Sequence, residues 1–166
     1  MSAHLPETVD AWRMVAAQRS FSGRLPVSRL RRLTDLLASP EGWVDYRLQF
    51  DRDAGGTPTL HVVVSADVML VCQRTLEPFA STLAVDQMLG LVTDEAAEVA
   101  VASGSEPLLV QGPLQLETVI EDELLLAMPL IAVRPGSEAA LQPWQPPPEQ
   151  PAREHPFAAL GRLKQH

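Results

Sequence analysis

The sequence predicts an α+β fold in which an antiparallel sheet carries N-terminal helices and one late helix packed on it, followed by a Pro-rich C-terminal tail. Three observations support this class. Apolar and polar residues alternate over 43–52 and again over 60–72, as in half-buried strands. Apolar residues recur at helical spacing on both sides of this region. Six prolines crowd residues 143–156, where the backbone is too constrained to pack well.

The N-terminal part is expected to form a helix, a short strand and a second helix. Apolar side chains recur at helical spacing over 8–19, alternate over 20–27, and return to helical spacing over 29–38. Ser28 stands where a side-chain oxygen can cap the second helix, and Pro40 ends it.

The central part is predicted to be an antiparallel hairpin with a third strand. Residues 43–52 and 60–72 each gather their apolar side chains on one face, and the loop 53–58 contains the glycines and proline of a turn. Residues 78–85 continue in phase as the third strand.

The segment after this sheet contains a loop, a short strand and the late helix. Residues 93–106 are acidic and small and are predicted to be a loop, while 108–110 are predicted to form a short strand. A helix is expected over 114–127, because Pro113 suits a first helical turn and Pro129 stops the pattern.

Three parts of unequal size follow from this pattern. Residues 1–134 are predicted to form a single α+β domain, residues 135–155 a Pro-rich linker, and residues 156–166 a short amphipathic tail element.

Several features suit a protein of the cytoplasm. The N-terminal residues lack the apolar stretch of a secretion signal, and no apolar run reaches membrane-spanning length. The single cysteine, Cys72, cannot form an internal disulfide. We therefore expect a cytoplasmic protein that is not attached to a membrane.

Charge is unevenly distributed along the chain. Residues 1–32 carry +4, residues 33–150 carry −14 and residues 151–166 carry +2. Because an acidic body repels a phosphate backbone, any contact with RNA is expected from the basic ends, whereas the acidic middle would attract a basic protein or simply keep the chain soluble. The candidate contact residues in the two ends are Arg29, Arg31, Arg32, Phe157, Leu160, Leu163 and Lys164.

The sequence lacks the usual signatures of catalysis and of cofactor binding. It contains no Gly-rich phosphate-binding loop, and its four histidines never stand at metal-ligand spacing. Cys72 falls within an apolar pattern, which is typical of a small buried residue. We expect no catalytic residue, no cofactor, no bound metal and no small-molecule substrate.

Two charged residues fall on apolar faces. On a helical wheel of the late helix, Glu123 lies within the apolar arc, whereas Glu121 and Asp122 lie outside it. Arg74 extends the apolar face of the strand 60–72. A lone buried carboxylate is costly, so we predict that Glu123 and Arg74 form an ion pair.

Three segments together resemble the YceD family of large ribosomal RNA subunit accumulation proteins. In order along the chain they are the strand end and turn 70–79, the helical stretch 120–130, and the tail 155–164. The overall pattern of the chain is similar as well. The resemblance implies a bacterial, non-enzymatic accessory factor in large ribosomal subunit biogenesis, which supports the synthesis, processing or stability of 23S ribosomal RNA.

In one position the chain departs from that family. Many members carry C-x-x-C in the first segment, where this chain has Cys72 and Thr75. One thiolate cannot complete a four-coordinate zinc site by itself, so a structural metal is not expected. Cys72, Arg74 and Glu123 are instead interpreted as structural residues of the family motifs.

The leading hypothesis is a protein that binds large-subunit ribosomal RNA or a large-subunit ribosomal protein. One alternative is a metal-dependent RNA-processing hydrolase that uses Asp67 or the acidic cluster 121–123; a closed pocket with converging carboxylates would support it. Another is a small barrel that binds an apolar ligand, which an empty apolar cavity would favour.

Overall fold

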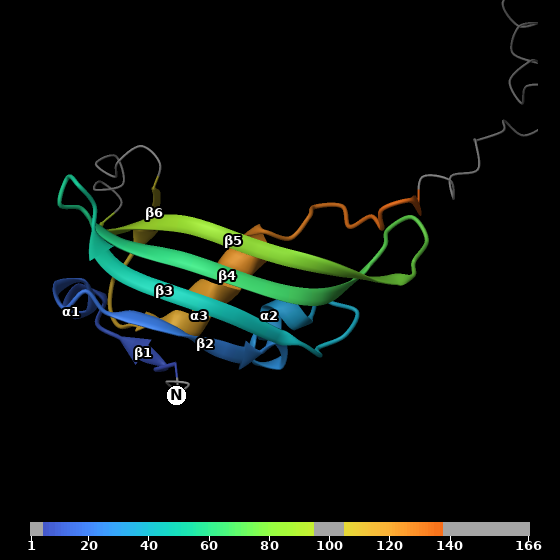
Figure 1. Cartoon of the computed structure of the whole chain (residues 1–166), viewed down its shortest axis with the longest axis horizontal. Coiled ribbons are helices and arrows are strands. Elements are labelled where there is room, and N and C mark those ends of the chain that lie inside the picture. Colours follow the sequence, from blue (N-terminus) through green and yellow to red (C-terminus); the bar gives the residue numbers. More distant parts are fainter. Residues whose placement is uncertain (1–4, 95–104, 138–166) are drawn as a thin grey trace, which may run out of the picture.

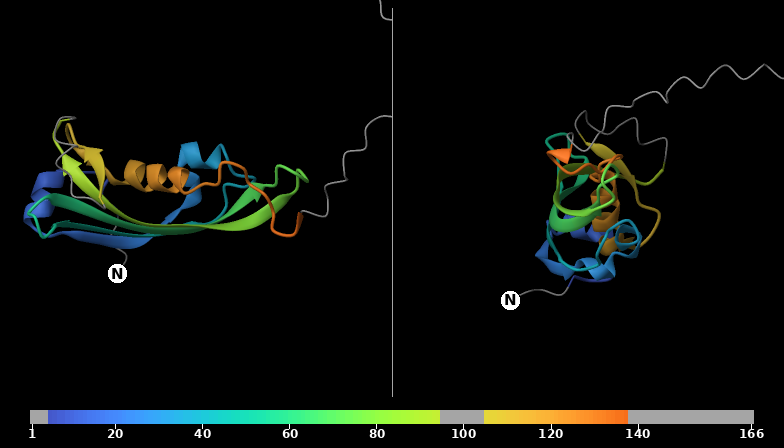
Figure 2. Two further views of the ribbon diagram at one scale, coloured as in Figure 1. Left: turned by 90° about the horizontal axis from the view of Figure 1, so that it is seen from above. Right: turned by 90° about the vertical axis from the view of Figure 1, so that its right-hand side faces the viewer.

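The computed structural model describes residues 5–94 and 105–137. It confirms the α+β class: one long, curved sheet carries helices on its concave side (Figures 1 and 2). The elements in chain order are β1 (Thr8–Val9), α1 (Ala11–Ala16), β2 (Ser20–Pro26), a 3-10 turn (Val27–Arg29), α2 (Arg31–Thr34), β3 (Trp43–Arg52), β4 (Pro58–Val71), β5 (Pro78–Val92), β6 (Glu106–Leu109), β7 (Leu114–Gln115) and α3 (Leu116–Leu126).

The main sheet has the strand order β2-β3-β4-β5-β6. Strands β2 to β5 are joined in antiparallel pairs, as predicted, whereas β6 lies parallel to β5 with Leu89 opposite Glu106. The sheet is open, because its two edge strands β2 and β6 do not pair with each other. This arrangement contradicts the small-barrel alternative.

The core lies between the concave face of the sheet and α3. Even-numbered residues of β3 and β4 point into it, and among them Leu48, Phe50 and Leu60 are fully buried. From α3, Leu116, Ile120 and Leu124 are also fully buried, at the spacing of a single helical face. This packing holds α3 across the middle of the sheet (Figure 1).

A glycine stands where the Tyr46 ring approaches β2. Gly23 is paired with Tyr46, and a Cβ atom at position 23 would come within 2.8 Å of the Tyr46 hydroxyl oxygen. The small residue lets the Tyr46 ring lie buried against the strand.

The predicted helices are too long: 8–19 and 114–127 extend past α1 and α3 at both ends, and 29–38 extends past α2 at its C-terminal end. Residues 8–9 and 114–115 are not helical, because β1 and β7 pair with each other in an antiparallel ladder. Pro113 therefore precedes a strand instead of opening a helix. The predicted helix 29–38 shrinks to the 3-10 turn and the single turn of α2. Ser28 caps neither, since neither element has a side-chain cap from a neighbouring residue.

Strand β5 is longer than predicted, since it continues to Val92 rather than 85. Its extension pairs with the start of β4 and with β6.

None of the helices within the described ranges is long and apolar enough to cross a membrane.

Candidate functional site

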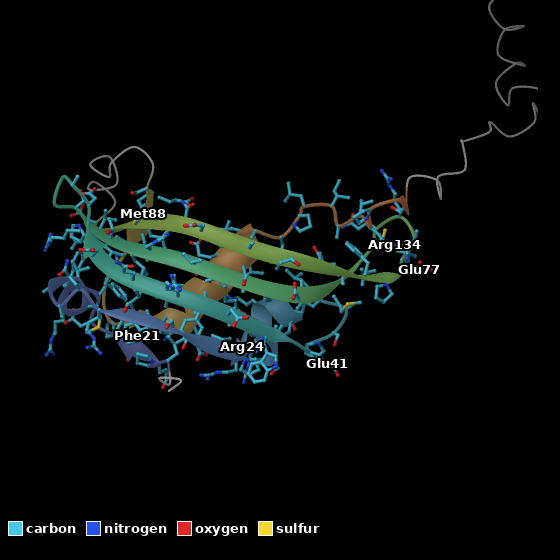
Figure 3. All side chains as sticks on the ribbon, viewed as in Figure 1. Phe21, Arg24, Glu41, Glu77, Met88 and Arg134 are labelled. Carbon is cyan, nitrogen blue, oxygen red and sulfur yellow. The ribbon has the colours of Figure 1, made fainter. Side chains whose placement is uncertain are left out.

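The convex face of the sheet is not covered by helices in the described part of the chain (Figures 2 and 3). Outward-pointing side chains of β2 to β5 make up this surface, which we call the open face. Its charged members are Arg24, Arg47, Asp45, Asp51, Asp67 and Asp86. Acids therefore outnumber arginines there, in keeping with the acidic middle of the sequence.

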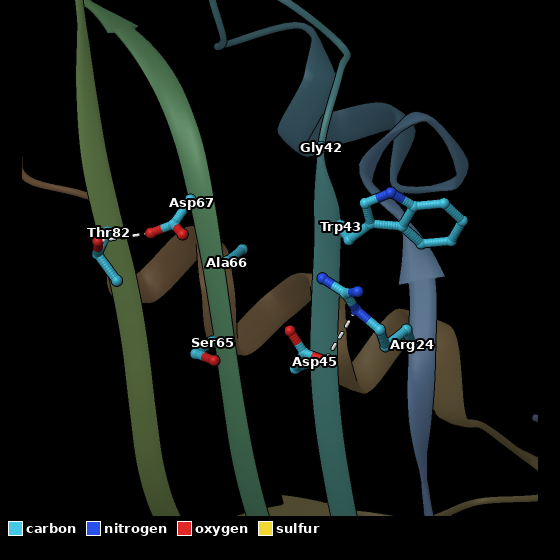
Figure 4. A pocket seen from close by; sticks show the side chains of 8 residues that line it. All are labelled: Arg24, Gly42, Trp43, Asp45, Ser65, Ala66, Asp67 and Thr82. Carbon is cyan, nitrogen blue, oxygen red and sulfur yellow. Dashed lines mark hydrogen bonds and ion pairs between the residues drawn. The ribbon is translucent and has the colours of Figure 1, made fainter. Parts of the chain in front are cut away.

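A shallow pocket of about 330 Å³ lies at one end of the open face (Figure 4). Arg24 Nε pairs with Asp45 Oδ1 at 3.0 Å, and the guanidinium carbon of Arg24 lies 5.5 Å from the centroid of the Trp43 ring. Asp67 Oδ1 accepts a hydrogen bond of 2.6 Å from the Thr82 hydroxyl. The Trp43 side chain remains 53% exposed, so the pocket offers an aromatic surface beside two carboxylates.

This pocket does not have the arrangement expected of a hydrolase. It is open to solvent, and the carboxylates of Asp45 and Asp67 are engaged with Arg24 and Thr82 rather than directed at a common point. Within residues 5–94 and 105–137, no three His, Cys, Asp or Glu side chains are grouped so that they could hold a metal ion. No observation favours the metal-dependent alternative.

Two of the three arginines predicted to contact RNA are paired with acids of α3. Arg29 forms an ion pair with Glu117. Arg32 binds Glu121 Oε2 through Nε at 2.9 Å and Asp122 Oδ1 through a terminal nitrogen at 2.7 Å. These hydrogen bonds to Glu121 and Asp122 raise the pKa of Arg32. The structure thus places Arg29 and Arg32 together, with their charges compensated.

Arg31 differs from its neighbours. Its side chain is exposed and takes part in none of the ion pairs found in the described part of the chain. Of the three predicted contact residues, Arg31 is the one whose charge stays open to an external partner.

The position of Glu121 overturns the helical-wheel interpretation. This residue is only 8% exposed, although the wheel put it outside the apolar arc. Its carboxylate accepts hydrogen bonds from the backbone N–H groups of Arg32, at 2.7 Å, and of Leu33, at 3.2 Å. These are the second and third N–H groups of α2, which a capping side chain normally satisfies. A residue of α3 therefore caps α2.

Glu123 is buried, as predicted, and is likewise 8% exposed. Burial and then the negative charges of Glu106 and Asp122 raise the pKa of its carboxyl. The ion pairs between described residues do not include one between Glu123 and Arg74, so the predicted pair is not supported. The carboxylate of α3 that pairs with an arginine is that of Glu121, which is buried, while the Arg32 side chain that it binds is about half exposed.

The turn after β4 encloses Cys72, which is fully buried. Its Sγ accepts the backbone N–H of Arg134 at 3.4 Å, and Thr75, at the second position of the C-x-x-C pattern, contributes a side-chain hydrogen bond. These bonds, that of Arg134 first, outweigh burial and lower the pKa of Cys72 to about 6. The thiol thus serves as an acceptor that holds the later segment against the turn.

The predicted tail residues Phe157, Leu160, Leu163 and Lys164 lie outside the described residues, as do residues 138–155 of the predicted linker 135–155 and the greater part of the predicted loop 93–106. The proposed division at these positions remains a prediction.

The Trp43 pocket was not singled out from the sequence. The alternation of polar and apolar residues predicted that Asp45 and Arg24 are exposed. It could not show that Arg24 lies beside Asp45 and Trp43, because that depends on the register between β2 and β3. An exposed tryptophan at the start of a strand was the available signal.

Two comparisons with known proteins give the same description. The family model described as "Large ribosomal RNA subunit accumulation protein YceD" matches residues 60–164. A relative of the same description from Haemophilus influenzae is 27% identical over 168 residues, covering 97% of this chain and 97% of its own. No solved structure matches.

Proposed function

Because the chain belongs to the YceD family of large ribosomal RNA subunit accumulation proteins, we propose that it promotes the accumulation of large-subunit ribosomal RNA as a binding protein and not as an enzyme. The family members are named as accumulation proteins. The open pocket and the engaged carboxylates of Asp45 and Asp67 are consistent with binding.

The charge of the described body favours a protein partner over RNA. Residues 5–94 and 105–137 contain ten arginines and sixteen acidic residues, a net charge of −6. The observation that carries the proposal is that Arg29 and Arg32, the expected RNA contacts, are neutralised by acids of α3. A surface of this sign repels phosphates and attracts basic chains. We therefore propose a basic protein of the large subunit as the direct partner.

The open face is the proposed contact surface. It combines an excess of carboxylates with the exposed ring of Trp43, and aromatic residues are enriched at protein interfaces. Its shallow pocket can receive an arginine or lysine side chain beside Asp67. Arg31 and the basic tail remain the residues through which RNA would be contacted.

Affinity capture of the full chain from growing cells, with and without ribonuclease treatment, tests this proposal. We expect a large-subunit ribosomal protein to stay bound after ribonuclease. Recovery that depends on intact RNA would make RNA the direct partner, and recovery of neither would contradict the proposed function.

A matched pair of charge reversals locates the surface. Asp67→Lys changes the open face, whereas Asp35→Lys makes the same change at an exposed position following α2. We expect the first variant to lose the captured protein at moderate salt and the second to retain it. Equal retention by both variants would exclude the open face.

A further inference from the structure

A second surface feature lies at the end of the sheet where β4 turns into β5. It is an apolar groove of about 400 Å³ beside the C-terminal end of α3. We define the apolar groove by six of its lining residues, Leu36, Leu70, Leu76, Leu125, Met128 and Leu130. Leu76 is 77% exposed and Leu130 is 99% exposed. Large apolar side chains gathered on one surface commonly mark a binding site.

The described chain lines this groove shortly before it ends. Ala132 lines it, and its carbonyl oxygen accepts the backbone N–H of Gln73 at 2.8 Å. Arg134 is held to Cys72 Sγ through its N–H and to Glu77 through an ion pair of 3.0 Å (Figure 3). Residues 138–166 are therefore tethered within a few positions of a residue that lines the groove.

The sequence of the tail fits such a groove. Phe157, Leu160 and Leu163 recur every three residues, so a helix would gather them on one side. A segment this short does not hold a helix alone in water and needs a surface to pack on. The proline-rich residues between 137 and 156 span up to roughly 3 Å each when extended, which is ample reach for a groove at their starting point.

The family match includes both the tail and nearly all of the groove, which is a separate observation. The match over residues 60–164 ends with the tail. The same match contains every lining residue of the groove except Leu36. The groove and the tail thus belong to one matched block, whereas most of the N-terminal part lies outside it.

We propose that the apolar groove binds residues 156–164 of the same chain, with Phe157, Leu160 and Leu163 packed against the exposed leucines Leu76 and Leu130. A short tether gives the tail a local concentration in the millimolar range, so even a weak apolar contact is occupied. The inference concerns the free chain and does not depend on the proposed function.

Amide NMR spectra of the full chain test this docking. Leu160→Asp places a charge on the apolar side of the tail, and we expect it to shift the amide signals of Leu76 and Leu130. The matched control Ala158→Asp would lie on the opposite side of such a helix and should leave those signals in place. Unchanged groove signals in Leu160→Asp would overturn the proposal.

A reciprocal change and a mixing experiment complete the test. Leu130→Asp should shift the signals of residues 157–163, whereas Ile131→Asp, at an exposed neighbour that does not line the groove, should not. Labelled Leu160→Asp chain is then mixed with unlabelled wild-type chain. If the tail docks within its own chain, the Leu76 and Leu130 signals of the labelled variant stay shifted. If these signals return to their wild-type positions, the groove binds the tail of a second copy, and the proposal is wrong.

Discussion

Glu121 and Arg32 are joined twice across the helical layer. Glu121 Oε1 accepts the backbone N–H of Arg32 at 2.7 Å, and Oε2 accepts its side-chain Nε at 2.9 Å. Helix α2 is a single turn whose own N-cap residue, Leu30, contributes no side-chain hydrogen bond. A helix of this length is unstable alone, so the α3 carboxylate helps to hold it in place together with the buried side chain of Leu33.

Replacing Glu121 is therefore expected to destabilise the fold. Glu121→Ala removes the acceptor for two backbone N–H groups and one ion pair, at a cost of about 2 kcal/mol or more in the free energy of unfolding. Asp122→Ala removes only a half-exposed ion pair with Arg32 and should cost less than about 1 kcal/mol. Urea denaturation of both variants measures the difference. Equal losses would contradict the capping role.

Replacing Glu123 is expected to stabilise the fold at neutral pH, in contrast to replacing Glu121. The pKa of Glu123 is raised by burial and by Glu106 and Asp122, so the folded chain binds the proton more tightly than the unfolded chain does. Its stabilising effect is complete below the unfolded pKa and is lost as pH rises through the folded pKa. Glu123→Gln should therefore raise the urea midpoint at pH 7 and change it little in acid. A lower midpoint at pH 7 would show that the ionised carboxylate has a favourable partner.

Ionisation of Cys72 should make the folded chain more stable at alkaline pH than at acidic pH. The folded pKa of Cys72, about 6, lies below that of an unfolded thiol. The corresponding stabilisation is present above the unfolded pKa and is lost as pH falls through 6. We expect the stability difference between wild type and Cys72→Ala to shrink from pH 9 to pH 6. Thr75→Val, which removes one hydrogen bond to the thiol, should move the thiolate absorbance titration to higher pH.

Zinc is not expected to bind at this turn. Cys72 already accepts the Arg134 N–H, and Thr75 stands where a second thiolate would be required. Elemental analysis of the purified chain should give no stoichiometric zinc. Thr75→Cys, which restores the C-x-x-C spacing, is the matched comparison. Stoichiometric zinc in the wild-type chain would refute this prediction.

Removal of residues 152–166 tests the predicted role of the tail in cells. The buried residues of β3, β4 and α3 pack against one another in a single core, so the melting temperature should change little. Rescue of large-subunit RNA levels in a null strain should be lost. A truncated chain that unfolds would make the tail part of the core, and one that still rescues would show that the tail is dispensable.

Local periodicity determined much of the sheet from the sequence by itself. Strand β3 was predicted at its observed bounds, and the burial of Glu123 followed from its place in the apolar arc of α3. Such features depend on residues within a few positions of one another, because strand and helix repeats are short. The family resemblance also came from local segments and was confirmed by the family match.

Tertiary structure decided which distant residues meet. Glu121 caps α2 from 89 positions along the chain, β1 turns residues 8–9 into a strand by pairing with β7, and α3 neutralises Arg29 and Arg32. The charge and helical propensity of these residues were visible in the sequence, but their partners were not. An ion pair, a cap or a two-residue strand is stable only when the packed core brings its second half within hydrogen-bonding distance, and no repeat along the chain encodes that distance.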